Sequence, residues 1–90
     1  MTTQQIKDFV EDYFKVNLIS KSRKAEVVRI RYLYYHLCSS YSDGFPSHIA
    51  IASTVGVDRN SVRHGLETLE SFTFQDKKFK KHCDNVLAIV

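Results

Sequence analysis

The sequence is poor in proline and glycine and has no long apolar run. Its 90 residues include one proline and three glycines, which leaves little room for the many turns of an all-β fold. No apolar stretch approaches the roughly 18 residues that span a bilayer, and residues 1–16 are too polar and acidic for an export signal. A chain this short buries only roughly 60 to 65% of its unfolded surface, enough for one core. We therefore expect a single helical, cytoplasmic domain over residues 1–90.

Residues suited to metal or covalent chemistry are also few. The two cysteines, Cys38 and Cys83, fit reduced thiols in the core better than a disulfide in a chain without an export signal. Neither has a histidine at a recognised zinc-binding spacing. No serine, cysteine or histidine has a visible base with an orienting partner. We expect no enzyme activity, no metal and no cofactor.

Basic residues are only slightly in excess, with 13 lysines and arginines against 10 aspartates and glutamates. They are unevenly distributed, because residues 15–31 contain six basic side chains and one acidic side chain. Such a run is typical of a surface that contacts a polyanion, although a solvated face without a ligand shows it as well. The lysines within residues 77–81 surround Phe79 at helical spacing, which favours simple solvation there.

Apolar residues recur at helical spacing along most of the chain, and this pattern predicts an all-α bundle of five helices. Ser47, Asp58 and Asp76 are the expected N-caps. Helices are expected over residues 3–16, 24–40 and 47–55, from Asp58 onward and from Asp76 onward, with residues 72–75 as the last connection. In the second helix the core stripe is expected to contain Val27, Ile30, Tyr34, Leu37 and Tyr41.

Residues 49–66, IAIASTVGVDRNSVRHGL, have the layout of a helix-turn-helix. Ala52 is small where the two helices cross, Gly56 lies at the turn, and Val62 and Leu66 fix the second helix to the core. The first turn of that helix then points other side chains outward. The segment therefore predicts an exposed recognition helix that begins near residue 58.

Five residues at the start of this helix are candidates for DNA contacts. Arg59 and Arg63 can bind guanine O6 and N7, and Asn60 can bind adenine N6 and N7, so we expect all three at base edges in the major groove. Asp58 can cap the helix and also accept from the exocyclic amine of cytosine. Ser61 can reach a phosphate. Any solvent-exposed helix can carry such residues, and only their place after the turn favours DNA.

The basic loop at residues 21–24 predicts a second contact. An arm of arginine and lysine beside a major-groove helix can reach the adjacent minor groove or its phosphates. We expect Arg23 to enter the minor groove, and Lys21 and Lys24 to contact phosphates. A solvated loop without a ligand is the alternative.

Four segments together resemble the C-terminal DNA-binding domain of the DnaA family of bacterial replication initiators, along nearly the whole chain. They are IKDFVEDYF (6–14), SKSRKAEVVRIR (20–31), GVDRNSVRHG (56–65) and DKKFKKHCDNVL (76–87). The third is similar to the family signature G-[RK]-D-H-[ST]-T-V-x-H-A. The resemblance implies a DnaA-like helix-turn-helix bundle in which Arg23 enters the minor groove, Asp58, Arg59 and Asn60 face bases, and Lys21 and Ser61 hold phosphates.

The chain also departs from this family. The family's His-Thr pair after the aspartate is Arg59-Asn60 here, the preceding basic residue is Val57, and the usual Arg-Gln of the long helix is Arg31-Tyr32. The altered pair Arg59-Asn60 falls where the family reads its DNA, so its recognition sequence is not carried over. The chain has no G-x-x-x-x-G-K-[ST] loop and is too short for the initiator's ATPase.

The resemblance therefore implies a freestanding regulator of replication or transcription. It would bind duplex DNA, with one monomer on each site. A phage or mobile-element regulator, a competitor for initiator sites, and an isolated domain all fit the sequence. The replication initiator itself or other regulators are candidate partners.

Two other classes of protein compete with this interpretation. FPSHIAIASTVGVDRNSVRHGLETLE (45–70) is also similar to the winged helix of GntR-type transcription regulators, whose wing would need FTF (72–74) and VLAIV (86–90) as strands. A protein-binding adaptor could use the same helical packing without touching DNA. It would carry acidic, apolar or other polar residues in place of Arg59, Asn60 and Arg63.

Overall fold

The computed structural model describes residues 1–19, 24–44 and 46–89, and within these ranges every regular element is an α-helix. The helices are α1 (Thr3–Phe14), α2 (Ala25–Tyr41), α3 (His48–Val55), α4 (Arg59–Gln75) and α5 (Lys77–Ile89). The predicted all-α bundle of five helices is confirmed. No helix in the described ranges is long and apolar enough to cross a membrane.

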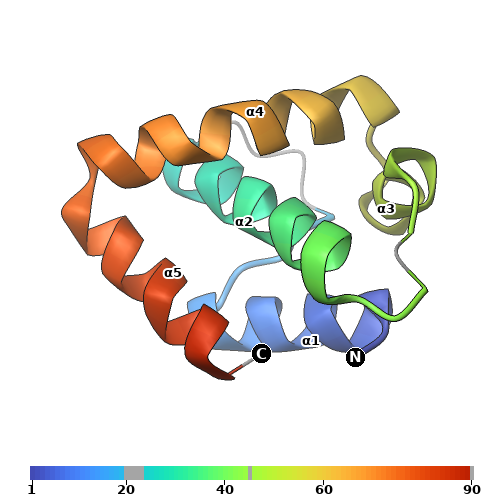
Figure 1. Cartoon of the computed structure of the whole chain (residues 1–90), viewed down its shortest axis with the longest axis horizontal. Coiled ribbons are helices and arrows are strands. Elements are labelled where there is room, and N and C mark those ends of the chain that lie inside the picture. The colour runs from blue at the N-terminus through green and yellow to red at the C-terminus, as the bar shows by residue number, and fades with distance from the viewer. Residues whose placement is uncertain (20–23, 45, 90) are drawn as a thin grey trace.

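Helix α2 is the centre of the bundle. It packs against α1, α3 and α4, while α5 packs against α4 (Figure 1). Because neighbours surround α2, its buried residues extend beyond the predicted stripe to Leu33, Tyr35 and Cys38. Tyr41 was wrongly expected in that stripe: it lies in the last turn of α2, beyond these contacts, and is 46% exposed.

Helix α1 is tied down by polar contacts at both ends. Thr2 and Gln5 form a capping box at its start, and the helix ends at Phe14, two residues before the predicted end at Val16, because the chain turns into the left-handed region at Lys15. Glu11 accepts hydrogen bonds from the Lys7 ammonium and from the backbone N–H of Leu18, both at 2.9 Å. This second bond holds the loop so that the Leu18 side chain is fully buried.

Helix α4 is longer than predicted, because residues 72–75 continue it instead of connecting it to α5. Phe72 stacks on Tyr32 with ring centroids 5.7 Å apart, and the Arg29 guanidinium lies 5.2 Å from the Phe72 ring centre. Arg29 also pairs with Asp76 at 2.8 Å. As predicted, Asp76 caps α5, accepting from the N–H groups of residues 78 and 79. The corner between α4 and α5 is therefore fixed by α2.

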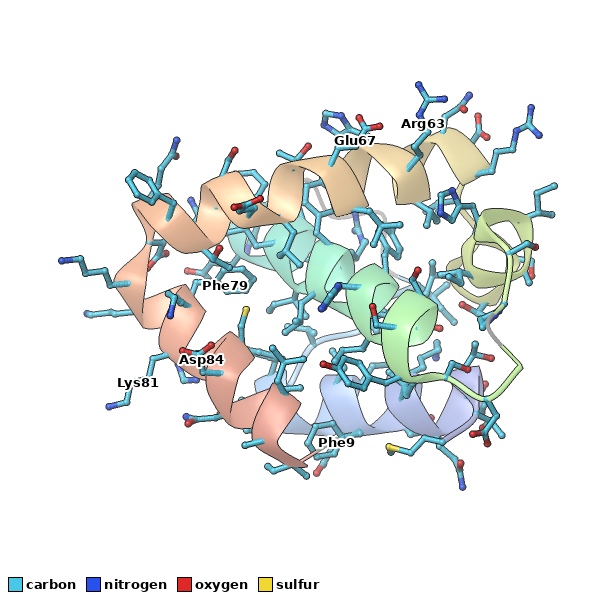
Figure 2. All side chains as sticks on the ribbon, viewed as in Figure 1. Phe9, Arg63, Glu67, Phe79, Lys81 and Asp84 are labelled. Atoms are coloured by element: carbon cyan, nitrogen blue, oxygen red, sulfur yellow. The ribbon has the colours of Figure 1, made fainter. Side chains whose placement is uncertain are left out.

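Helix α5 occupies the place where a winged-helix protein would have its wing. Residues 72–74 belong to α4 and residues 86–89 belong to α5, so neither expected strand segment is extended in the described part of the chain. Figure 2 shows Phe79 pointing from α5 toward the interior, and Phe79, Cys83 and Val86 are buried. The winged-helix alternative is wrong for this fold.

Both cysteines are free and buried, as predicted from the sequence. Burial raises the pKa of the Cys38 thiol and of the Cys83 thiol to about 11. The reactive thiolate is therefore scarce at neutral pH. We expect iodoacetamide at pH 8 to leave the native protein unmodified and to alkylate both thiols in urea, as measured by mass spectrometry. Equal alkylation rates in both conditions would contradict this burial.

Candidate nucleic-acid interface

The turn between α3 and α4 sets the direction of α4. Gly56 ends α3 in the left-handed region at φ 68°, a conformation that favours glycine. Its N–H and that of Val57 both donate to the carbonyl of Ala52, the latter at 3.1 Å. Asp58 then starts α4, and its carboxylate accepts from the N–H of Asn60 at 3.1 Å. A glycine turn and an aspartate cap thus join a short helix to a long one.

Packing decides which face of α4 is exposed. Val62 and Gly65 are buried, and a Cβ added at Gly65 would lie 2.6 Å from Tyr32 and 2.7 Å from Tyr35. The helix therefore approaches α2 closely along this face. The opposite face carries Arg63 and Glu67, which point away from the bundle in Figure 2.

The first turns of α3 and α4 form one hollow of about 430 Å³. We call it the α3–α4 hollow. It is lined by Ser47, His48, Ile49, Arg59, Asn60 and Arg63. The structure thus brings together the three predicted base-reading residues of α4. The residues on the α3 side were not predicted, because Ser47 was expected only as an N-cap. The spacing along one helix does not show which side chains of another helix lie opposite it.

The α3–α4 hollow is electropositive. Its lining includes Arg59 and Arg63 but no acidic residue. The start of α3 has no acidic residue in its first turn, whereas the Asp58 carboxylate caps the start of α4. Within the described part of the chain, the side chains of Arg59 and Asn60 make no hydrogen bond or ion pair, which leaves their donors open. The Arg63 Nε lies 3.5 Å from a Glu67 carboxylate oxygen, and both side chains are largely exposed.

Arginine at the first position of a helix is locally unfavourable, because a cation there opposes the helix dipole. Arg59 occupies this position in α4. Local rules of stability are most often broken at functional sites. The stability of α4 therefore does not explain why Arg59 stands at this position, whereas binding of a ligand does.

The other predicted contacts are less closely grouped. Ser61 is exposed in the first turn of α4 but does not line the α3–α4 hollow. Lys21 and Arg23 lie outside the described residues. Lys24 directly precedes α2. The Arg29–Asp76 ion pair holds this end of α2 against the C-terminal end of α4, so Lys24 lies toward that end of α4. Since α4 has 17 residues, that end is about 25 Å from the hollow.

Among the described residues, no group of three or more histidine, cysteine, aspartate or glutamate side chains could hold a metal ion. The expected absence of a metal site therefore stays an expectation for the whole chain. The arrangement at the α3–α4 hollow offers hydrogen-bond donors and positive charge. Its chemistry is that of binding an anionic ligand with acceptor groups.

The protein is an all-α bundle, and its candidate site is an open cationic hollow at the starts of two helices. The chain is 34% identical over 85 residues to the chromosomal replication initiator protein DnaA of Flavobacterium psychrophilum. This match covers 90% of the chain but 17% of that protein. No family model matches the chain, and no solved structure matches it. The chain is therefore distantly similar, over nearly its whole length, to a small part of DnaA.

Proposed function

We propose that this chain is a sequence-specific DNA-binding domain in which the first turn of α4 enters the major groove of duplex DNA. One observation carries the proposal: Arg59, Asn60 and Arg63 line a single open hollow at the start of α4. The similarity to a replication initiator supports the same class of function. The helix, the tight turn and the second helix would act together as a helix-turn-helix.

The α4 side chains of the α3–α4 hollow have chemical counterparts on DNA. Arg59 and Arg63 can each make paired hydrogen bonds to guanine, and Asn60 can do so to adenine. The cap at Asp58 uses one carboxylate oxygen, so the other can accept from a cytosine amine or orient an arginine. The start of α3, which has the neutral cap Ser47, favours a nearby phosphate. The site therefore has donors for bases and positive charge for the backbone.

Phosphate contacts would extend the interface away from α4. Ser61 would donate to a phosphate from the first turn, and Lys21 and Lys24 would hold phosphates farther along. Arg23 would enter the adjacent minor groove. We propose that residues 1–90 act as one domain, with one monomer on each site.

The biological role that fits best is regulation of replication or transcription. The relative's name assigns it replication initiation, and the chain spans 17% of that protein. Residues 1–90 contain no G-x-x-x-x-G-K-[ST] loop, so the role proposed for them is DNA recognition without ATP hydrolysis. A phage or plasmid regulator and a competitor for initiator sites would both use this module.

Selection of bound duplexes from a random pool, repeated at two salt concentrations, tests the proposal. We expect a defined site to be enriched.

Asn60→Ala should then reduce discrimination at one position of that site by about 1 to 3 kcal/mol, because a paired contact to adenine is lost. The measurement is the dissociation constant for each single-base variant of the site. An unchanged preference would show that Asn60 does not read bases.

Lys21→Ala is the contrasting variant. A lost phosphate contact weakens binding to every duplex alike and lowers the slope of log affinity against log salt by roughly 0.9. The sequence preference should stay as in the unmodified protein. If both variants had the same effect, the division into base and phosphate contacts would be wrong.

A further inference from the structure

Phe74 is the most exposed large apolar side chain of the described residues, at 86%. It lies near the C-terminal end of α4, at the corner with α5 and about 22 Å along the helix from Arg59 (Figure 1). Beside the ring is a hollow of about 370 Å³, which we call the α4–α5 hollow. It is lined by Glu70, Thr73, Phe74, Lys77 and Lys80.

Duplex DNA does not suit this surface. Glu67, Glu70 and Phe74 follow Arg63 at helical spacing, so they share the outer face of α4. The two glutamates are exposed, and their carboxylates would repel a phosphate backbone. They separate the cationic start of α4 from Phe74. Because exposed aromatic side chains are enriched where proteins meet, a protein surface is the better occupant.

The charges around the α4–α5 hollow suit a second copy of this chain. Glu70 lies on its α4 side and Lys77 on its α5 side. In the described part of the chain, neither of these two side chains makes a hydrogen bond or an ion pair. In a two-fold interface the contact of one residue with another is made twice, once in each direction. Glu70 of each copy can therefore pair with Lys77 of the other.

The shape of the surface also suits a two-fold interface. Phe74 projects directly beside the hollow that it lines. A two-fold axis between the ring and the hollow lets each ring enter the hollow of the other copy, and the contact closes on itself. A ring far from its hollow would instead join copies into an open chain.

We propose that two copies of this chain associate around a two-fold axis at the corner of α4 and α5, with Phe74 of each copy in the α4–α5 hollow of the other. This inference goes beyond the proposed function and does not depend on DNA. The α3–α4 hollow lies at the other end of α4 and stays open in each copy. The association is weak, because two aromatic side chains bury about 300 to 500 Å² of the roughly 1,200 Å² that a stable interface needs.

Sedimentation equilibrium of the full chain without DNA tests the inference. We expect a monomer–dimer equilibrium with a dissociation constant on the order of 100 μM. Phe74→Ser should weaken the dimer by about 30-fold or more, the loss typical of a residue at the centre of an interface. The matched control is Ile89→Ser, which removes another exposed apolar side chain of α5 outside the hollow. It should leave the dissociation constant unchanged.

Charge reversal tests whether the occupant is a second copy. Glu70→Lys makes both edges of the hollow basic, and Lys77→Glu makes both edges acidic. Like charges then meet in each variant's own dimer, which should be about fivefold weaker than the unmodified dimer at low salt. An equimolar mixture of the two variants restores both opposite pairs. It should therefore associate as tightly as the unmodified protein.

Three results would overturn the inference. The first is an unmodified protein that stays a monomer up to about 1 mM, which would leave Phe74 for a different protein or a lipid surface. The second is an equal loss in Ile89→Ser and Phe74→Ser, which would indicate unspecific apolar contact. The third is a mixture of the two charge variants that associates no better than either alone. Selection of duplexes tests the proposed function separately, so that function stands in all three cases.

Discussion

Gly65→Val should lower the free energy of unfolding by about 3 kcal/mol, because overpacking a tight contact typically costs 1 to 3 kcal/mol and a branched side chain is the worst case. At Gly65 the first added carbon alone would lie 2.6 Å from the Tyr32 ring and 2.7 Å from the Tyr35 ring. Urea unfolding followed by circular dichroism measures the loss.

Neither ring can move aside easily. Tyr35 is almost fully buried, and Tyr32 is stacked on Phe72 in the contact that fixes the end of α4. Valine has a better helix propensity than glycine, but this gain of a few tenths of a kcal/mol is much smaller than the steric cost. The valine side chain at position 65 would therefore force α2 and α4 apart.

Ser71→Val is the matched control for this prediction. Ser71 lies in the same helix, on its exposed side, so valine there meets no neighbouring helix. We expect its unfolding free energy to change by less than about 1 kcal/mol. If Gly65→Val were as stable as Ser71→Val, the close approach of α2 and α4 would be wrong.

Local signals in the sequence were enough to predict most of the helices. Ser47, Asp58 and Asp76 were expected as N-caps, and each accepts a backbone N–H at the start of its helix. Capping depends on residues within three positions of one another, so it can be recognised without knowing the fold. The same holds for the turn at Gly56, which needs only a left-handed conformation.

Features that depend on packing between distant segments were missed. Leu18 falls between the first two predicted helices, and only its N–H bond to Glu11 and its complete burial show that it belongs to the core. Gly65 was not recognised as a contact point, because Tyr32 and Tyr35 reach it from another helix. Spacing along one helix cannot reveal such partners.

The candidate site shows the same division between local and distant information. The outward direction of Arg59 followed from the buried positions later in its own helix. The place of Ile49 opposite it depends on how α3 and α4 cross, which the sequence pattern does not describe. The α4 residues of the hollow were therefore predictable, and those contributed by α3 were not.

Arg59→Glu should reduce binding to the selected duplex by roughly 100-fold or more while leaving the fold at least as stable. The change removes a base contact of about 1 to 3 kcal/mol and adds an anion that phosphates repel. In the free protein the same substitution should raise the free energy of unfolding by about 0.3 to 1 kcal/mol, because a carboxylate at the first position of a helix complements the helix dipole. Anisotropy titration and thermal unfolding measure the two effects.

Lys77→Glu is the control that distinguishes an effect at the site from an effect of net charge. Lys77 is the first residue of α5 as Arg59 is of α4, both side chains are exposed, and both substitutions change the net charge equally. Figure 1 shows that these two helix starts lie at opposite ends of α4. If binding depends on the start of α4, Lys77→Glu should weaken it less than about tenfold, by long-range repulsion that salt screens. Equal losses in the two variants would mean that only overall charge attracts the DNA.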